Sequence, residues 1–334
     1  MKVLILSNAP APNQRWEAEE RSDRGVLDAV SSISQALKAN GHVVATGEIG
    51  ERPEDLLQLL DREQPDTVFN LCETIRGNSR LEPAVPFLLR WRGVPFSGNG
   101  PQTISILLEK TTTKRLLRDH RLPTPAFHDL VSESDIDDWY IWPAILKPAA
   151  EDASLGIDAG SVVRDREAAR ERFRLLAERF GTPVLIEQYI DGRELNVAVL
   201  ETSEDLLLGV NEIDFSEMPE HVPHIVTYNA KWVEESAEFL KSPVRAPANL
   251  PPEIDAEVRR LVRQTFAALH LAGYARIDLR LDTQNQPWIL EVNPNPDISP
   301  GAGFVKALPE MGVSYEQAIE IIVQRACRTK GIPR

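Results

Sequence analysis

The sequence of 334 residues is poor in cysteine, in long apolar runs and in positive charge. Its two cysteines, Cys72 and Cys327, form no cluster with metal-ligand spacing, and reduced thiols are typical of a cytoplasmic protein. No apolar run approaches the ~18 residues of a membrane span, and MKVLILSNAP predicts a first strand instead of a signal peptide. A formal net charge of -14 disfavours nucleic acid as the main partner, because phosphate backbones bind positive surfaces. We therefore expect a cytoplasmic protein that binds neither membranes nor nucleic acids.

The sequence also lacks a glycine-rich loop after its first strand, because SNAPAPNQ contains no glycine, and this disfavours a dinucleotide site there. The first hundred residues instead alternate between strand and helix patterns. The predicted strands are 3–7, 42–46 and 67–71, and the predicted helices are 26–39, 54–62 and 83–91. Strands that alternate with helices indicate a parallel sheet, so we expect an open α/β lobe.

Beyond Thr103 the pattern changes. The predicted elements are a helix at 110–120, a strand that enters a small-residue loop at 144–157, an exposed helix at 164–180 and a strand–turn–strand at 184–200. Residues 242–252 hold four prolines and are predicted to form a surface loop inside the last lobe, since a strand pattern resumes beyond them. A chain of this length exceeds one ordinary core, so two or three lobes are expected.

The segments ARIDLRLD and PWILEVN predict a β-hairpin near the C-terminus. In the first of them Ile277, Leu279 and Leu281 face one side and the charged residues face the other. The residues TQNQ between the two segments have the length of a hairpin loop. We expect an antiparallel register in which Asp282 pairs with Pro287.

This register has a chemical consequence near the other end of the hairpin. It places Asp278 opposite Glu291 and Arg276 opposite Asn293. Two carboxylates at cross-strand distance repel each other, so either a positive group lies between them or one of them is protonated. The oxygen atoms of Asp, Glu and Asn suit Mg²⁺, which usually shares phosphate oxygens with a nucleotide. Taken alone, an ordinary solvated hairpin with aligned charges remains the alternative.

Two lysines favour the nucleotide interpretation. Lys147 ends an apolar strand, where a cation is costly unless it meets an anion, and Lys110 begins a helix, where a cation is mildly unfavourable. The small residues of AEDASLG (150–156) allow backbone N–H groups to approach phosphate oxygens. Glu187 lies between apolar residues and Glu194 follows a turn, so a strand edge there can bind adenine and Glu194 the ribose hydroxyls. Each feature alone fits a surface charge, and only their combination predicts a site.

Several segments together resemble, in the same order, those of the ATP-grasp superfamily and its D-alanine–D-alanine ligase branch. They are VFNLCE, GVPFSGNGPQTISILLEKTTTKRLL, AILKPAAEDASLGI, LIEQYIDGRELNV, YNAKW, YARIDLRLD and WILEVNPNP. The match runs over nearly the whole chain, and this co-linearity is more specific than any single motif. The resemblance implies an N-terminal open parallel α/β lobe at 1–105. It also implies a two-lobed ATP-grasp fold at 106–190 and 191–334 that holds ATP between its lobes.

The resemblance also implies the residues that bind ATP and its metal ion. The nucleotide contacts would be Lys110, Lys147 and Lys231 near the phosphates, Glu187, Gln188, Tyr189 and Ile190 along the adenine edge, and Glu194 at the ribose. The ligands of Mg²⁺, with Mn²⁺ as an alternative, would be Asp278, Glu291 and Asn293, which the hairpin register also brings together.

The implied reaction joins a small-molecule carboxylate to an amine. The carboxylate attacks the γ-phosphate of ATP, and the amine then attacks the resulting acyl phosphate. The catalytic residues would be Arg276, Lys231 and Ser154, of which Arg276 resembles the family's arginine that stabilises the oxyanion. The loop at 150–156 is expected to close as a lid that excludes water. A homodimer through the first lobe is expected by analogy alone.

The first loop departs from the pattern of the D-alanine ligases. Those enzymes have a glycine-rich segment followed by a glutamate that binds the amine of the first substrate. This chain has SNAPAPNQRWEAEERSD instead, in which Glu17, Glu19 and Glu20 are the candidates for that role.

Other positions at the implied substrate site also differ. The family's substrate-binding serine falls on Ala153, beside the retained Ser154, and the tyrosine after the lid lysine is Trp232. The serine that holds the acceptor carboxylate is Ala302, and a glycine of the oxyanion site is Asp297, which binds a cationic acceptor or caps the next turn. Since lost hydroxyl groups change discrimination by orders of magnitude, we expect substrates other than two D-alanines.

Three other functions remain as alternatives. The first is D-alanine–D-alanine ligation itself, with a rearranged pocket for the first substrate. The second is an ATP-grasp small-molecule kinase, which the oxyanion position of Arg276 disfavours. The third is a catalytically silent nucleotide-binding module, which the full set of acidic and basic site residues disfavours. The sequence does not distinguish an amine acceptor from a thiol.

Overall fold

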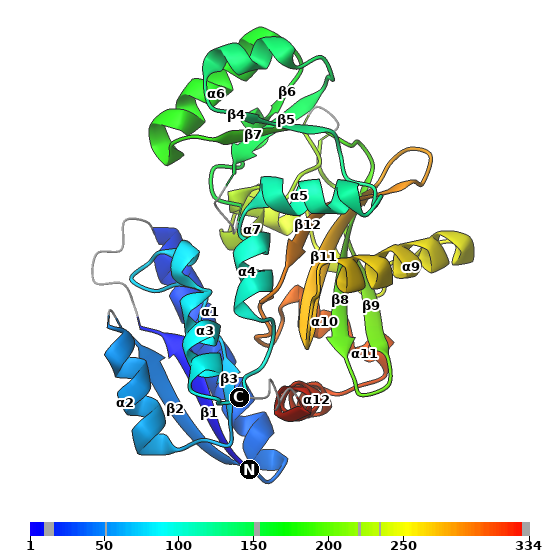
Figure 1. Ribbon diagram of the computed structural model, residues 1–334. Helices are drawn as coiled ribbons and strands as arrows, with labels where there is room; N and C mark the ends of the chain where they lie inside the picture. The colour runs from blue at the N-terminus through cyan, green and yellow to red at the C-terminus, as the bar shows by residue number, and fades with distance from the viewer. Residues whose placement is uncertain (10–16, 51, 150–153, 220–221, 234, 329–334) are drawn as a thin grey trace.

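The computed structural model describes residues 1–9, 17–50, 52–149, 154–219, 222–233 and 235–328, with the backbone alone for residues 17–25. The described strands form three sheets that follow one another along the chain (Figure 1). Among the described residues, no helix combines the length and the apolar character needed to cross a lipid bilayer.

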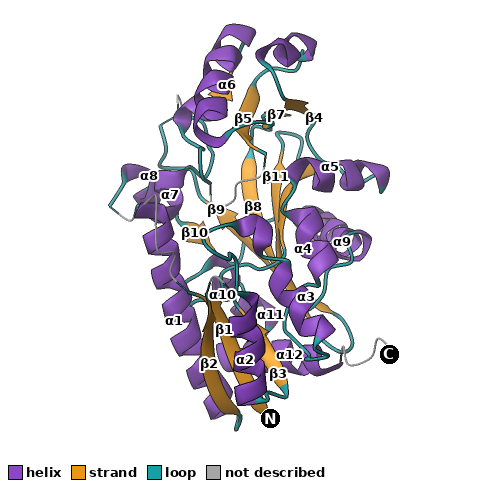
Figure 2. Cartoon of the chain, turned by 60° about the vertical axis from the view of Figure 1, so that its left-hand side comes forward, coloured by secondary structure: helices purple, strands orange, loops and turns teal. Residues whose placement is uncertain are grey.

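The first sheet is parallel, as the sequence predicts. Its strands are β1 (Lys2–Asn8), β2 (Val43–Ile49) and β3 (Thr67–Asn70), in the order β2-β1-β3. The accompanying helices are α1 (Glu17–Ala39), α2 (Pro53–Glu63) and α3 (Ala84–Trp91). Residues 3–6 of β1 are all apolar because both faces of the strand are covered. Val3 and Ile5 lie in a buried cluster with α1, while Leu4 and Leu6 lie in another with α2 and α3 (Figure 2).

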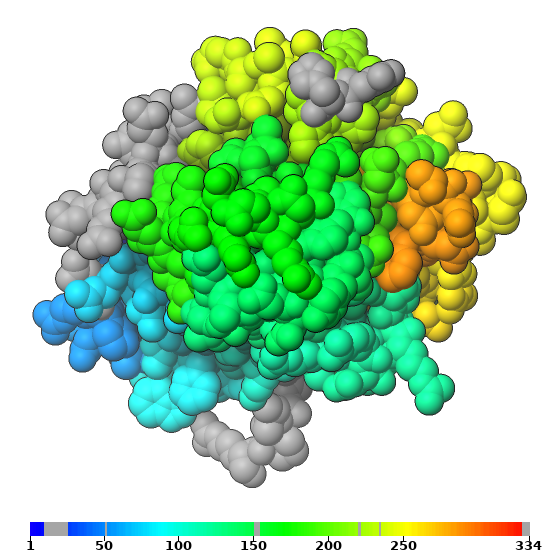
Figure 3. Space-filling model, turned by 90° about the horizontal axis from the view of Figure 1, so that it is seen from above, coloured from blue at the N-terminus to red at the C-terminus, as the bar shows by residue number. Residues whose placement is uncertain are grey.

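The second sheet carries the strand that leads into the predicted phosphate loop. It is antiparallel, in the order β4-β7-β5-β6, with β4 (Phe127–Leu130), β5 (Ala144–Pro148), β6 (Val162–Val163) and β7 (Val184–Gln188). Helix α6 (Arg166–Phe180) covers it, because Phe173 and Leu176 share one buried cluster with Leu146 and Ile186. Seen from above, this part of the chain forms the centre of the nearest face (Figure 3).

The third sheet contains the predicted hairpin. Its order is β10-β9-β8-β11-β12, with β8 (Arg193–Glu201), β9 (Leu206–Ile213), β10 (Val244–Arg245), β11 (Tyr274–Leu281) and β12 (Pro287–Asn293). Ile277, Leu279 and Leu281 are buried in a cluster with α9 (Pro252–Ala268), so the charged residues of β11 face away from α9. The predicted strand–turn–strand at 184–200 is confirmed as two strands. These strands, β7 and β8, belong to different sheets, and residues 189–192 connect them.

The first pair of the hairpin differs from the predicted one. The predicted pairing of Asp282 with Pro287 is wrong, because Leu281 pairs with Pro287. A β-bulge between Asp278 and Leu279 then shifts the register by one residue on β12. Beyond the bulge Asp278 lies opposite Glu291, as predicted, and Arg276 lies opposite Asn293, also as predicted. The predicted cross-strand pairs are therefore confirmed, although their starting point was one residue out.

The remaining helices are mostly short. They are η1 (Ser79–Leu81), α4 (Pro101–Leu107), α5 (Lys110–Asp119), η2 (Glu133–Asp138), η3 (Ala159–Ser161), α7 (Tyr228–Trp232), α8 (Ala237–Leu240), α10 (Gly303–Lys306), α11 (Leu308–Met311) and α12 (Tyr315–Arg328). The predicted loop at 242–252 includes the two-residue strand β10. Helix α12 returns to the first sheet, because Ile319 and Ile322 share a buried cluster with Val3 and Ile5. Sequence order alone does not predict this return.

The side chain of Asn99 connects the segment before α4 to the third sheet through hydrogen bonds. It is 2% exposed, and its amide nitrogen donates to the carbonyl oxygens of Tyr274 at 3.1 Å and Pro294 at 2.7 Å. Its amide oxygen accepts from the N–H of Ala272 at 2.8 Å. One side chain therefore satisfies three backbone groups at the start of β11 and just after β12.

We expect Asn99→Ala to lower the free energy of unfolding by about 3 kcal/mol, because one buried and two partly buried backbone groups lose their partner. Urea denaturation followed by circular dichroism measures this loss. Asn78→Ala is the control, since exposed Asn78 accepts a single hydrogen bond from the Arg80 N–H at the start of η1. A loss for Asn99→Ala no larger than that of the control would contradict this account of the junction.

Candidate active site

The paired carboxylates of the hairpin are each neutralised by a cation from the protein. Asp278 accepts from Nε and Nη2 of Arg276, both at 2.8 Å, and from Nδ2 of Asn196 at 2.8 Å. Glu291 lies 3.1 Å from Nζ of Lys110, which begins α5. The positive charge that the cross-strand pair requires therefore comes from Arg276 and Lys110.

The proton equilibria of this cluster favour the charged forms. Partial burial raises the pKa of Glu291, but Lys110, Lys147 and Arg276 together outweigh it and hold the pKa below its ordinary value. Burial likewise lowers the pKa of Arg276, and Asp278 outweighs it, so that the pKa is raised. The carboxyl group of Glu291 and the guanidinium group of Arg276 are consequently ionised near neutral pH, and the end of the hairpin carries a dense arrangement of fixed charges.

The same positions offer oxygen atoms that suit a hard divalent cation. Within the ranges that the structure describes, no group of three or more His, Cys, Asp or Glu side chains gathers as a metal cluster. The set at the hairpin instead combines the carboxylates of Asp278 and Glu291 with the amide oxygen of Asn293, which accepts from the Asn295 N–H at 2.9 Å. Carboxylate and amide oxygens are the protein ligands that Mg²⁺ prefers, so these residues fit that ion by their chemistry.

Lys231 belongs to the same cluster of charges. It lies on α7, whose first turn is capped by Thr227 through a bond from the Ala230 N–H at 3.1 Å. Burial and the nearby Arg276 lower the pKa of Lys231 below its ordinary value. Its ammonium group lies 5.2 Å from the centre of the Trp232 ring, so Trp232 shields one side of this cation.

Ser154 connects the end of the predicted lid to the segment that leads into α7. Its hydroxyl donates to the Val226 carbonyl at 3.1 Å, and the Tyr228 N–H donates to the Ile157 carbonyl at 3.0 Å. The hydroxyl of Ser154 thus holds backbone segments together. Residues 150–153 of the small-residue loop lie outside the described residues, as do the side chains of Glu17, Glu19 and Glu20.

A second charged cluster lies where β5 and β7 meet α5. Glu187, expected along the adenine edge, has a side chain that is 1% exposed, and its carboxylate lies between two lysines. Nζ of Lys114 donates to Oε1 at 2.7 Å, and Nζ of Lys147 lies 2.9 Å from Oε2. Lys114 was not predicted as a site residue from the sequence. Its signal was helical spacing, since Lys114 lies three residues before the buried Leu117 on the inner face of α5.

A third cluster organises the connection between β7 and β8. Glu194, expected at the ribose, accepts from Nη2 of Arg280 at 2.9 Å, and burial raises the pKa of this carboxyl. Arg280 also donates to the carbonyls of Ile190 and Gly192, at 3.1 and 3.3 Å, and lies 5.4 Å from the Tyr189 ring. Arg280 was not assigned a role from the sequence, although it shares the charged face of β11.

The backbone of this connection is also held in place. The Gln188 N–H donates to the Ala126 carbonyl at 2.8 Å, and the Tyr189 N–H donates to the Pro143 carbonyl at 3.0 Å. The positions of Gln188 and Tyr189 beside the second sheet are therefore set by main-chain bonds.

The carboxyl end of the first sheet meets the end of the hairpin. Asn295 accepts from the Tyr274 hydroxyl at 2.9 Å and donates to the Cys72 carbonyl at 3.4 Å. Cys72 is fully buried, as expected for a packed thiol, and burial raises its pKa well above the ordinary value. Asp297 is exposed and accepts from the Ser299 N–H at 2.7 Å, so it caps the following turn.

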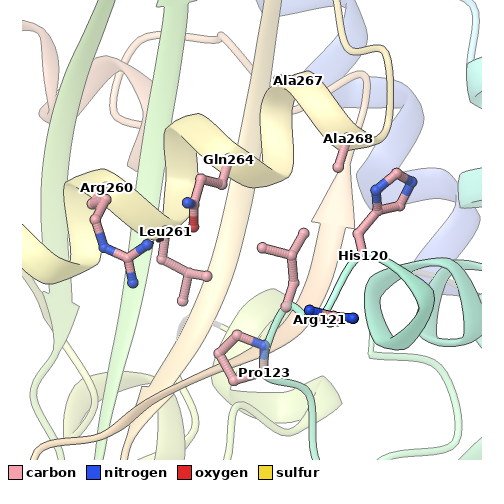
Figure 4. A pocket seen from close by; sticks show the side chains of 9 residues that line it. His120, Arg121, Pro123, Arg260, Leu261, Gln264, Ala267 and Ala268 are labelled. Carbon is pink, nitrogen blue, oxygen red and sulfur yellow. Dashed lines mark hydrogen bonds between the residues drawn. The ribbon is translucent and has the colours of Figure 1, made fainter.

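A separate hollow of about 610 Å³ lies between α9 and the turn after α5 (Figure 4). Leu122 and Pro123 form part of its wall, and Arg121, Arg260 and Gln264 line it as well. None of the predicted site residues lines this hollow. The candidate site is therefore the set of charged clusters, and this hollow is not part of it.

Comparisons with known proteins place the chain in a family. Residues 124–324 match the family described as "D-ala D-ala ligase C-terminus". The chain is 32% identical to a D-alanine–D-alanine ligase of Bordetella pertussis over 246 residues, which cover 72% of this chain and 73% of that protein. It is 29% identical to a D-alanine–D-alanine ligase of Gloeobacter violaceus, with 98% and 99% covered. It is also 31% identical to uncharacterized protein y4sG of Sinorhizobium fredii, with 96% and 91% covered.

A solved structure supports the same fold. The crystal structure of the D-alanine–D-alanine ligase from Bacillus anthracis, complexed with ATP, superposes with a TM-score of 0.75 at 18% identity. The superposition covers 99% of this chain and 98% of that one. The predicted fold class, a parallel α/β lobe followed by a two-lobed ATP-grasp fold, is thereby confirmed. The chain therefore belongs to the D-alanine–D-alanine ligase family and is an ATP-grasp, ATP-dependent carbon–nitrogen ligase.

Proposed function

We propose that this ligase joins a small-molecule carboxylate to an amine through an acyl phosphate, and that its substrates are not two D-alanines. The observation that carries the proposal is the cluster at the end of the hairpin. There Asp278 and Glu291 face each other across two strands and are balanced by Arg276 and Lys110. Fixed charges of this kind stabilise charge that develops during phosphoryl and acyl transfer.

In this proposal ATP lies between the second and third sheets. Its phosphates contact Lys110, Lys147 and Lys231. Its adenine lies beside the segment formed by Glu187, Gln188, Tyr189 and Ile190, and its ribose contacts Glu194. We propose Asp278, Glu291 and Asn293 as ligands of Mg²⁺, which supplies charge neutralisation to the transferred phosphoryl group. The lobes proposed for this task are 1–105, 106–190 and 191–334.

The chemistry then requires positioning and no covalent protein nucleophile. A carboxylate oxygen of the first substrate attacks the γ-phosphorus in line, and ADP leaves. The amine of the second substrate attacks the acyl carbon, and Arg276 donates hydrogen bonds to the oxyanion that forms. Collapse of that intermediate expels phosphate, and the amine loses a proton to complete the amide. Arg276 suits this role because its raised pKa keeps it a cation throughout the working pH range.

The difference in substrates rests on the positions where the chain departs from the D-alanine ligases. Trp232 replaces a tyrosine and Ala302 replaces a serine, so hydroxyl groups that recognise the D-alanine pair are missing. Sites built on hydrogen bonds discriminate strongly when one partner is removed. D-alanine–D-alanine ligation is the second candidate, and the names of the relatives from Bordetella pertussis and Gloeobacter violaceus favour it.

A phosphate-release screen tests the choice of substrates. Amino acids and small carboxylates are supplied with ATP and Mg²⁺, each with and without an amine acceptor. We expect release that depends on both a carboxylate and an amine, with D-alanine alone at least about 100-fold less effective than the best pair, because of the lost hydroxyl groups. Efficient turnover with D-alanine alone would favour the second candidate. A stable phosphorylated alcohol as product would contradict ligase chemistry.

We expect Glu291→Gln to reduce turnover by at least about 100-fold, because a charge that neutralises the transferred phosphoryl group is worth several kcal/mol. Steady-state phosphate release measures the loss, and thermal denaturation checks that the fold is kept. Glu253→Gln, on the exposed first turn of α9, is the matched control and should retain full activity. Wild-type turnover in Glu291→Gln would show that the proposed metal set is wrong.

A further inference from the structure

One buried carboxylate holds two lysines in this structure. Lys114 donates from Nζ to Oε1 of Glu187 at 2.7 Å, and Nζ of Lys147 lies 2.9 Å from Oε2 of the same carboxylate. The side chains differ in access, because that of Lys114 is 2% exposed and that of Lys147 is 11% exposed. Lys147 is therefore the partner that can reach a ligand, whereas Lys114 is enclosed.

Lys114 is also bound from its other side. Its ammonium group donates to Oγ1 of Thr124 at 2.9 Å, and the Thr124 hydroxyl donates to the carbonyl of Ile289 at 2.9 Å. Ile289 lies on β12, two residues before Glu291. These bonds fix Lys114 between helix α5 and the strand that carries the proposed metal ligand.

We propose that Lys114 is a positioning residue that allows Lys147 to leave Glu187 and bind a phosphate of the nucleotide. This inference rests on the proposed function, in which Lys147 contacts ATP. When Lys147 turns toward the phosphate, Glu187 stays paired with Lys114 and the buried pair remains neutral. Glu187 in turn keeps Lys147 in place before ATP arrives.

The physical reason is the cost of an unpaired buried charge. A buried carboxylate that loses its last counter-ion pays a large desolvation penalty. Without Lys114, Lys147 would be the sole counter-ion of Glu187, and ATP would have to compete with that carboxylate for it. With Lys114 present, a phosphate of ATP binds Lys147 while Glu187 keeps Lys114 as its counter-ion.

The protonation of the cluster agrees with this arrangement. Burial lowers the pKa of Lys114 to about 8, and the attraction of Glu187 opposes the decrease, so Lys114 is largely charged at pH 7. Burial raises the pKa of Glu187, but Lys114 and Lys147 outweigh it and hold the pKa below its ordinary value. The Glu187 carboxylate thus lies between two lysine side chains, and Lys147 is available for a phosphate while Lys114 stays paired.

A double-mutant cycle on ATP binding tests the proposal. Lys114→Met, which keeps an unbranched side chain shorter by one atom and removes the charge, is expected to weaken binding of ATP with Mg²⁺ by about tenfold, the scale of one charge-assisted hydrogen bond. In a Glu187→Gln background the same substitution should change binding by less than about twofold, because no carboxylate remains to retain Lys147. Titration calorimetry at pH 7 with the four proteins gives both numbers.

Two controls separate this role from a merely structural one. Adenosine has no phosphate, so its affinity, measured by competition, should be the same for wild type and Lys114→Met. Lys114→Gln replaces Lys114→Met in the cycle if thermal denaturation shows that the methionine variant is unfolded. Equal weakening of ATP binding by Lys114→Met in both backgrounds would overturn the proposal, and so would equal weakening for ATP and adenosine.

Failure of the proposed function has a different signature. In that case the wild-type protein itself would show no binding of ATP with Mg²⁺ and no carboxylate-dependent phosphate release. Wild-type binding that is unchanged in Lys114→Met would instead leave the ligase in place and overturn only the role of Lys114.

Discussion

The structure depends on one electrostatic constraint, the apposition of Asp278 and Glu291 across strands β11 and β12. Like charges at this spacing are unfavourable, and the protein offsets the repulsion by giving each carboxylate its own cation. Arg276 comes from the same strand, and Lys110 comes from the start of α5. The position of α5 against the third sheet is thereby coupled to the charge balance of the hairpin.

The constraint extends to the other charged clusters around the hairpin. The cations that influence one another there are Lys110, Lys114, Lys147, Lys231, Arg276 and Arg280, and the carboxylates paired with or close to them are Glu73, Glu187, Glu194, Asp278 and Glu291. Cations outnumber these carboxylates, although the whole chain has a formal charge of -14. A cluster with an excess of positive charge in an acidic protein attracts a polyanion such as a nucleoside triphosphate and gives it a preferred place on the molecule.

Much of this arrangement follows from local sequence. The alternation in ARIDLRLD separates a buried face from a charged one, and strand–helix alternation gives the parallel first sheet. The pairing of Asp278 with Glu291 was nevertheless predicted from a first pair that was wrong by one residue on β11. A bulge on β12 offsets this difference. Bulges depend on how a strand bends over its neighbours, and a periodicity of two does not reveal them.

The missed residues are those whose partners lie far away in sequence. Lys114 resembles a surface lysine of a polar helix until Glu187, 73 residues later, meets it. Asn99 binds backbone groups 173 to 195 residues away, and α12 returns to a sheet formed at the other end of the chain. Long-range contacts of this kind are set by the packing of whole lobes, for which a single sequence carries no local signal.

The central claim is that the paired carboxylates hold a divalent cation together with ATP. Its most direct test is the affinity for ATP measured at increasing Mg²⁺ concentration in the wild type and in Asp278→Asn. The account predicts that Mg²⁺ strengthens ATP binding to the wild type and has little effect on the variant. An equal strengthening in both proteins would contradict it, because the metal would then be held without the hairpin.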